Sequence, residues 1–185
     1  IVYVDIASVS PGSIDEARRM KFEDAPGRAR RIVRHGDIIW SMVRPNRRSF
    51  ALVLDPEPNL IVSTGFAVVS ATGVPSSYLY HALTTDEFVG YLANRATGAA
   101  YPAVKADDFE NAEILRPDHE ALHRFDDAVL SMLESRNSLA KKNHNLRQTR
   151  DLLLPKLISG VLDVSDLDIN VGDAAARRGP CWVTE

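Results

Sequence analysis

The longest stretch of this chain without proline or glycine runs from Asp118 to Leu154, between Pro117 and Pro155. Its 37 residues can form one continuous helix about 55 Å long, because an α-helix rises 1.5 Å per residue. Asp118 is a residue type that caps helix starts, and the prolines on either side favour its ends. Such a helix is longer than a domain built from the preceding residues, so the sequence predicts a domain followed by a long helix.

The apolar residues of this predicted helix recur every three or four positions and then every seven. A narrow apolar stripe with one polar position suits packing against a second long helix in a coiled coil, where the polar residue helps to fix register. The alternative is a surface helix that packs on its own domain. The predicted helix-helix seam is Leu122, Phe125, Val129, Met132, Leu139, Asn143, Leu146 and Leu153.

The first 117 residues predict a small mixed α/β domain of the α+β kind, built mostly of strands. Runs rich in β-branched or aromatic residues and bounded by turn residues indicate strands. The predicted strands are residues 1–6, 37–43, 50–54, 66–71 and 112–117. Thr84 and Glu87 form a capping-box pair for one helix, and Gly98 stands where that helix should stop.

Residues 155–185 are expected to hold a helix break at Pro155, a short helical turn capped by Gly160, a short strand at 161–164 and a polar tail. The tail spaces Asp166, Asp168 and Asn170 like the start of a calcium loop. Val171 and Arg177 then stand where that loop needs glycine and glutamate, so no calcium site is predicted.

Composition limits the class of protein. The chain has 185 residues, of which 45% are hydrophobic and 25% charged, as in a soluble domain with an extension. Cys181 is the single cysteine, which excludes a disulfide framework and a multi-cysteine metal site. No apolar run approaches the ~20 residues of a membrane span. We therefore expect a cytoplasmic protein without a membrane partner, and a start without Met predicts that residues precede Ile1.

Charge is unevenly distributed along the chain, although the net charge is only −3. Residues 1–50 hold ten Lys and Arg against six Asp and Glu. Residues 51–117 hold three against eight, and residues 118–185 hold nine against eleven. The basic excess of the first segment predicts one face suited to an anionic partner.

The residues His119-Glu120-Ala121-Leu122-His123 match H-E-x-x-H, in which two helical histidines bind zinc and the glutamate activates water. They lie in the first turns of the predicted helix, where the helix dipole is positive and disfavours a cation. No downstream residue is marked as a third ligand. We favour Glu120 as an acid that stabilises the helix start, with no metal bound, and a zinc metallohydrolase is kept as an alternative.

An ordered set of segments resembles a known family. GDIIWSMVRP, STGFAVVS, GAAYPAVKADDF, the long helix and LLLPKLISGVLDV occur in the order found in specificity subunits of type I restriction-modification enzymes, over roughly residues 1–164. A subunit of that family usually has two target recognition domains, each followed by a long helix, and the two helices pair antiparallel. The resemblance implies half of such a subunit: a recognition domain at 1–117, a spacer and dimerisation helix at 118–154, and a remainder at 155–185.

The resemblance further implies a non-catalytic protein that reads one half of a bipartite double-stranded DNA target and docks the methyltransferase (modification) subunits. The restriction subunit would join through the complex, and the second spacer helix would come from the same full-length subunit or from a homodimer. No cofactor is expected on this chain, since S-adenosylmethionine belongs to the methyltransferase subunits. The alternative is a DNA-binding regulator that dimerises through a zipper-like helix.

Basic and polar turn residues are the candidate DNA contacts. Lys and Arg supply sequence-independent affinity by releasing counterions, and Arg or Asn can read guanine or adenine through two hydrogen bonds. The alternative is that these are ordinary solvated charges and that Tyr101 belongs to the core. Ser41 qualifies only if its strand face is exposed, and Trp40 is expected to be buried. The candidates are Arg28, Arg30, Arg31, Arg34, Ser41, Arg44, Asn46, Arg47, Arg48, Tyr101 and Lys105.

Overall fold

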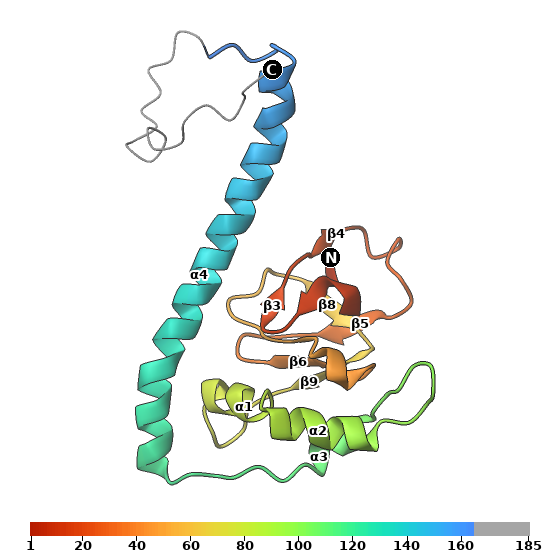
Figure 1. Ribbon diagram of the computed structural model, residues 1–185, viewed down its shortest axis with the longest axis vertical. Helices are drawn as coiled ribbons and strands as arrows, with labels where there is room; N and C mark the ends of the chain where they lie inside the picture. Colours follow the sequence, from red (N-terminus) through yellow and green to blue (C-terminus); the bar gives the residue numbers. More distant parts are fainter. Residues whose placement is uncertain (165–185) are drawn as a thin grey trace, which may run out of the picture. The chain divides into compact units, whose positions relative to one another are not determined.

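The computed structural model describes residues 1–164 and shows strands and helices that follow one another along the chain (Figure 1). The predicted polar tail, with its calcium-like spacing and Cys181, lies outside the described residues. The chain forms two compact units, Ile1–Ser138 and Leu139–Glu185, so the first unit includes the beginning of the long helix.

The strands form three small sheets. The strands are β1 (Val2–Val4), β2 (Val9–Ser10), β3 (Ser13–Ile14), β4 (Arg18–Arg19), β5 (Ala29–Ile32), β6 (Ile38–Ser41), β7 (Phe50–Leu52), β8 (Leu60–Ser63) and β9 (Phe66–Val69). One sheet has the order β4-β1-β8-β5, another β7-β6-β9, and β2 pairs with β3. Strands β1 and β8 are parallel, with Tyr3 opposite Ile61, and the other pairs are antiparallel. The domain is therefore mixed and strand-rich, as predicted.

Strand β6 is buried on both faces because its residues alternate between two cores. Ile38 and Trp40 belong to one core cluster, which the helices after β9 also join, and Ile39 belongs to the cluster beside β1 and β8. Side chains of successive strand residues point to opposite faces, so a fully apolar run fits a strand covered on both sides. Trp40 is buried as expected, and its indole N–H donates to the Leu83 carbonyl at 3.0 Å.

The strand predictions are right for four runs and wrong for two. Strands β1, β6, β7 and β9 lie inside predicted runs, whereas β2, β3, β4, β5 and β8 were not predicted. Residues 112–117 form no strand. Ala112 and Ile114 instead pack against the first core cluster as irregular chain, so their apolar character reflects burial without pairing. The expected strand at 161–164 is also wrong, because these residues form bends and irregular chain.

Three short helices follow β9. They are α1 (Ser76–Ala82), α2 (Asp86–Arg95) and α3 (Ala106–Glu110), and two 3-10 turns precede them, η1 (Ile6–Ser8) and η2 (Pro45–Arg47). Helix α2 is the predicted helix, but its cap is Thr85 and not Thr84. The Thr85 hydroxyl accepts a hydrogen bond from the Phe88 N–H at 3.2 Å, whereas Thr84 donates to the His81 carbonyl. The capping-box prediction is therefore wrong: the cap lies one residue later, and Phe88 stands where a capping box needs glutamate or glutamine.

The long helix α4 runs from His119 to Ile158. Asp118 caps it as expected, since its carboxylate accepts from the Ala121 N–H at 2.8 Å. The predicted break at Pro155 is wrong, because the helix continues through this residue. Proline removes one helical N–H, and the turn is still closed beyond it, where the Ser159 N–H bonds to the Pro155 carbonyl at 3.0 Å. Gly160, with a φ of 71°, ends the helix as predicted.

The first part of α4 packs on its own domain. Leu122 is buried, Phe125 lies edge-on to the rings of Tyr78 and His81, and Val129 packs against the first core cluster. Leu133 is 5% exposed in that cluster, whereas the neighbouring Met132 of the predicted seam is 67% exposed. This stretch therefore follows the alternative of a helix packed on its domain, with Leu133 facing inward in place of Met132.

The second part of α4 exposes the remaining residues of the predicted seam. Leu139, Leu146 and Leu153 are large apolar side chains in contact with solvent, at steps of seven residues continuing from Met132, and Asn143 is exposed as well. The role of this stripe in a coiled coil stays a prediction.

Candidate nucleic-acid interface

The segment Arg44–Arg48, which we call the arginine turn, is a tightly constrained loop between β6 and β7. Arg44 and Arg48 adopt left-handed conformations with φ of 51° and 57°, which is uncommon for residues with side chains. Between them Pro45 is fully buried. The Arg47 N–H donates to the Arg44 carbonyl at 2.9 Å and the Arg48 N–H to the Pro45 carbonyl at 3.0 Å, closing the 3-10 turn η2.

The segment Thr97–Ala103, which we call the tyrosine loop, is closed at its base by two hydrogen bonds between Thr97 and Ala103, each 2.9 Å long. Gly98 has a φ of 105°, and a Cβ there would lie 3.0 Å from the Tyr101 carbonyl oxygen. Glycine is therefore the residue that fits this turn. Tyr101 is 70% exposed, so the alternative that it belongs to the core is wrong.

The arginine turn and the tyrosine loop lie against each other, although they are far apart in the sequence. The Arg44 N–H donates to the Pro102 carbonyl at 2.7 Å, and its guanidinium donates to the Ala100 carbonyl at 3.1 Å. The Arg44 guanidinium carbon also lies 4.5 Å from the centre of the Tyr101 ring, a cation–π contact. These two predicted segments thus form one surface.

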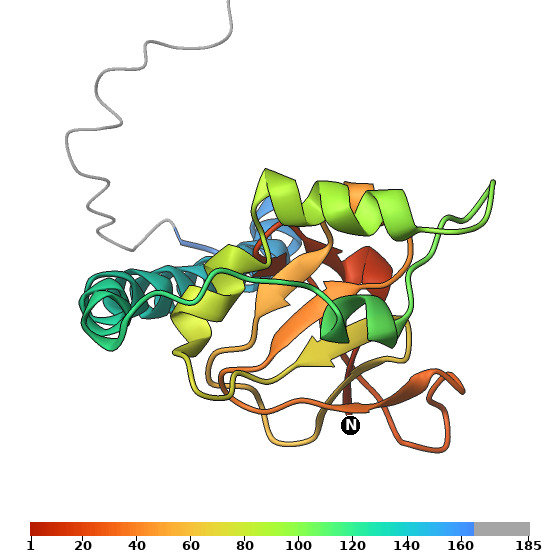
Figure 2. The ribbon, with the colours of Figure 1, turned by 90° about the horizontal axis from the view of Figure 1, so that it is seen from below.

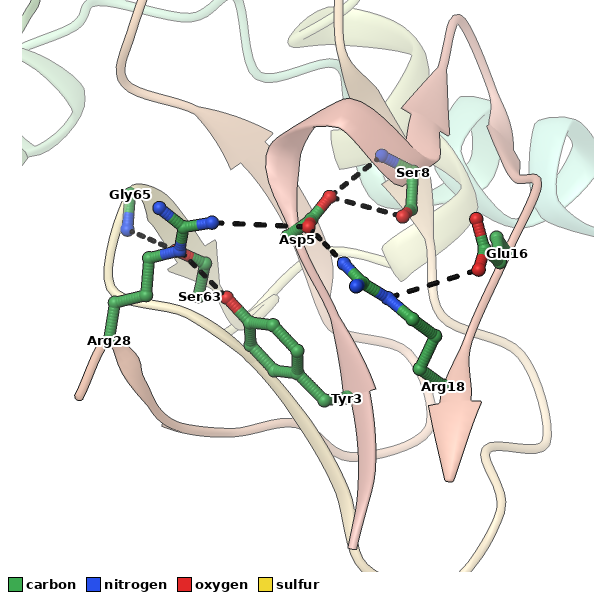
Figure 3. A network of polar contacts seen from close by, with 8 residues as sticks. All are labelled: Tyr3, Asp5, Ser8, Glu16, Arg18, Arg28, Ser63 and Gly65. Carbon is green, nitrogen blue, oxygen red and sulfur yellow. Dashed lines mark hydrogen bonds and ion pairs between the residues drawn. The ribbon is translucent and has the colours of Figure 1, made fainter. Parts of the chain in front are cut away.

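Arg28 belongs to a polar network around the buried carboxylate of Asp5 (Figure 3). Asp5 accepts hydrogen bonds from the Ser8 N–H and hydroxyl, both at 3.1 Å, and from Arg18. Arg28 lies 4.0 Å from the same carboxylate and donates to the Tyr3 hydroxyl at 3.1 Å. The hydrogen bond to Tyr3 is the main cause that raises the pKa of Arg28, to which the charge of Asp5 adds.

A series of backbone hydrogen bonds leads from Arg28 to Met42 and Val104, which lie next to the two loops in the sequence. The Thr64 N–H donates to the Arg28 carbonyl at 2.8 Å, and the Met42 N–H donates to the Gly65 carbonyl at 2.8 Å. The Val104 N–H then donates to the Met42 carbonyl at 2.9 Å. In Figures 1 and 2 the segment before β5 and the tyrosine loop both extend to the right of the domain, at different levels. We call this side, made of Arg28, the arginine turn and the tyrosine loop, the basic edge.

The run Arg28–Arg34 is divided by strand β5. Arg34 follows the strand and lies at the turn before β6, where its N–H donates to the Asp37 carboxylate at 2.7 Å. Arg30 is exposed, and its guanidinium carbon lies 5.2 Å from the centre of the Phe22 ring. Arg31 is partly buried, and its Nε has no hydrogen-bond partner within residues 1–164. Only Arg28 of this run thus takes part in the series of hydrogen bonds that leads toward the two loops.

Two other candidates have simple outcomes. Ser41 is 1% exposed, and its hydroxyl donates to the Val43 carbonyl at 2.8 Å. The prediction that Ser41 contacts DNA is therefore wrong, because its strand face is buried. Lys105 is exposed just after the tyrosine loop, and its N–H donates to the Asp108 carboxylate at 2.7 Å.

Sequence reasoning missed Tyr3 and Asp5, which contact Arg28, and Arg18, which binds the same Asp5 carboxylate. One signal was present: Asp5 precedes Ser8 by three residues, the spacing at which a carboxylate caps a helical turn, and it caps η1 here. The pairing of Asp5 with Arg18 and Arg28 has no local signal in the sequence.

His119 and His123 do lie side by side on α4, with their Nε2 atoms 3.1 Å apart and both side chains exposed. Within the described part of the chain, no group of three or more His, Cys, Asp or Glu residues is placed to hold a metal ion. Among residues 1–164, no helix combines the length and apolar character that crossing a membrane requires.

Comparison with known proteins finds similar proteins, although no family model matches the chain. The specificity subunit of the type I restriction enzyme HindI from Haemophilus influenzae is 22% identical over 157 residues, covering 83% of this chain and 34% of that protein. The solved HsdS subunit from Thermoanaerobacter tengcongensis is 28% identical with a TM-score of 0.60, covering 92% of this chain and 45% of that chain. A chain from a structural study of complex assembly in a type I R-M system matches with 28% identity, a TM-score of 0.62 and the same coverage.

Fold and comparisons define a class: an α+β domain followed by a long helix, of the kind found in type I restriction-modification systems. The resemblance predicted from the sequence is confirmed, because the chain is similar to specificity subunits of these enzymes. The chain spans less than half the length of these relatives.

Proposed function

We propose that this chain is a DNA-recognition half of a type I specificity subunit, which reads one part of a bipartite double-stranded target. The observation that carries the proposal is the contact between the arginine turn and the tyrosine loop, which gathers Arg44, Asn46, Arg47, Arg48 and Tyr101 on one edge of the domain. Arginine and asparagine are the side chains that most directly read base edges.

Electrostatics support this assignment. The first 50 residues carry the basic excess of the chain, and Arg28 adds a further charged group to the same edge. Neutralising DNA phosphates with such groups releases counterions and gives affinity for any sequence. A loop that reads bases, flanked by a cation that contacts phosphate, is the arrangement that DNA-binding proteins use for register and for specificity.

We further propose that α4 docks the methyltransferase subunits and pairs with a second spacer helix, from the same full-length subunit or from a second copy. The exposed leucines at seven-residue steps support this role, because a free apolar stripe on a helix favours a helical partner. In this proposal the chain is non-catalytic, S-adenosylmethionine is bound by the methyltransferase subunits, and the restriction subunit joins through the complex.

The same stripe favours a second candidate, a DNA-binding regulator that dimerises through α4. Two measurements on the tagged 185-residue chain separate the candidates: co-purification of methyltransferase subunits from its host, and selection from a library of random DNA duplexes. The proposal expects co-purification and recovery of one short sequence element. A chain that purifies without these subunits and selects a palindrome by itself would support the regulator, and recovery of no common sequence would refute both.

A further inference from the structure

The arginine turn contains two kinds of polar side chain, those engaged within the domain and those that are free. Arg44 is engaged by the Tyr101 ring and the Ala100 carbonyl. Arg48 forms an ion pair with Asp86 at the first position of α2. Both engaged residues stand at the ends of the turn, in left-handed conformations.

The free side chains are those of Asn46 and Arg47, between the two ends. Both residues are exposed, and neither side chain has a hydrogen bond, ion pair or ring contact to any residue of the described range 1–164. Their backbone is nevertheless fixed, because Pro45 is fully buried and the Arg47 N–H is bonded to the Arg44 carbonyl. The turn therefore displays two unengaged side chains from a rigid support.

This difference matters for reading bases. Arginine recognises guanine with two adjacent N–H donors, and asparagine recognises adenine with its amide donor and acceptor together. Arg44 and Arg48 already use part of their donor sets within the domain, so they would lose those contacts when binding a base. Asn46 and Arg47 lose none, and a rigid backbone reduces the entropy cost of fixing them on DNA.

We propose that Asn46 and Arg47 are the base-reading pair of the arginine turn, with Arg47 directed at guanine and Asn46 at adenine. Arg44 and Arg48 are positioning residues that hold the turn in its shape. This inference rests on the proposed function. It goes further by naming the two residues of the turn, out of five, that determine the target sequence.

The test is selection from random duplexes, run on the 185-residue chain in the form in which it purifies from its host, alone or in complex. Asn46→Ala and Arg47→Ala should each relax the base preference at one position, by about 5- to 150-fold against the wrong base, the range of one bidentate contact. Preference at the other positions should stay unchanged.

Asp86→Asn is the matched control, because it frees Arg48 without removing a cation from the edge. Because Arg48 holds the turn in its shape, this variant should lower affinity for the selected duplex while the preferred base at each position stays the same. Arg44→Ala should weaken binding to every duplex by a similar factor, because it removes one cation from the edge. Arg44→Lys keeps the charge but not the planar fork, so it should recover the salt dependence of the parent chain and only part of its affinity.

An unchanged selected sequence for both Asn46→Ala and Arg47→Ala would overturn the inference while leaving the proposed function in place. So would relaxation of a single base position by Arg44→Ala or Asp86→Asn. If the parent chain selects no sequence at all, the proposed function fails, and this inference fails with it. Thermal melts of each variant confirm that it is folded, which the exposure of Asn46 and Arg47 favours.

Discussion

Replacing Leu133 by alanine distinguishes the two sides of α4. Leu133 is 5% exposed in the core cluster that contains Trp40, whereas the adjacent Met132 is 67% exposed. The two residues have similar helix propensities, so truncating each to alanine changes the helix itself by nearly the same amount. A difference between the variants therefore reports packing on the domain.

The magnitude follows from burial. Leu133→Ala removes three buried carbons, worth roughly 2.4 kcal/mol at about 0.8 kcal/mol each, and the remaining cavity raises the loss to about 3 kcal/mol. For a chain of this size, one kcal/mol shifts the Tm by about 2–4 °C, so the Tm should fall by about 6–12 °C. Met132→Ala should cost about 0.5 kcal/mol or less, as exposed positions usually do.

Thermal and urea unfolding followed by circular dichroism measure both variants. The experiment is repeated at several protein concentrations, because a loss that arises from association changes with concentration and a loss from packing within one chain does not. Equal destabilisation by the two substitutions, or a larger loss for Met132→Ala at every concentration, would refute the assignment of Leu133 to the domain side of α4.

Three further predictions use other contacts. Gly98→Ala should destabilise the tyrosine loop by about 1–3 kcal/mol, because φ is 105° there; a Tm equal to that of the parent would contradict this strain. Asp5→Asn should lower stability by about 1–3 kcal/mol through weaker bonds to Ser8 and Arg18, measured by urea unfolding, and no loss would show that Asp5 does not hold this network. Protein purified without a histidine tag should contain no stoichiometric zinc by elemental analysis, and zinc that is lost on His123→Ala would instead support the hydrolase alternative.

The predicted elements that proved right are those with a strong local signal. The runs that became β6 and β7 are mostly apolar stretches of strand-forming residues, and Asp118 is a cap before a long run of helix-forming residues. Errors arose where tertiary packing decides. In the run 112–117, Ala112 and Ile114 are partly buried against the core, although no strand pairs with this run.

The candidate site shows the same limit. Both the arginine turn and the tyrosine loop could be identified from their residue types, since turns rich in Arg, Asn, Pro and Gly are recognisable locally. Their contact depends on the bridge between Val43 and Ala103, which joins positions that no sequence periodicity relates. Likewise, the rotation of the helix about its axis decides whether Met132 or Leu133 faces the domain. The seven-residue spacing selected Met132 and could not show that Leu133 is the buried residue.

The parallel pairing of β1 with β8 has a consequence for how the domain is made. Val2 pairs with Leu60, so a strand at the start of this chain cannot complete its hydrogen bonds until the residues of β8 have left the ribosome. Pairings between distant residues are slow because a long loop must close first. The β6–β7 hairpin, in contrast, joins strands close in sequence and carries the arginine turn between them. During synthesis the turn can thus take shape before β1 has paired with β8.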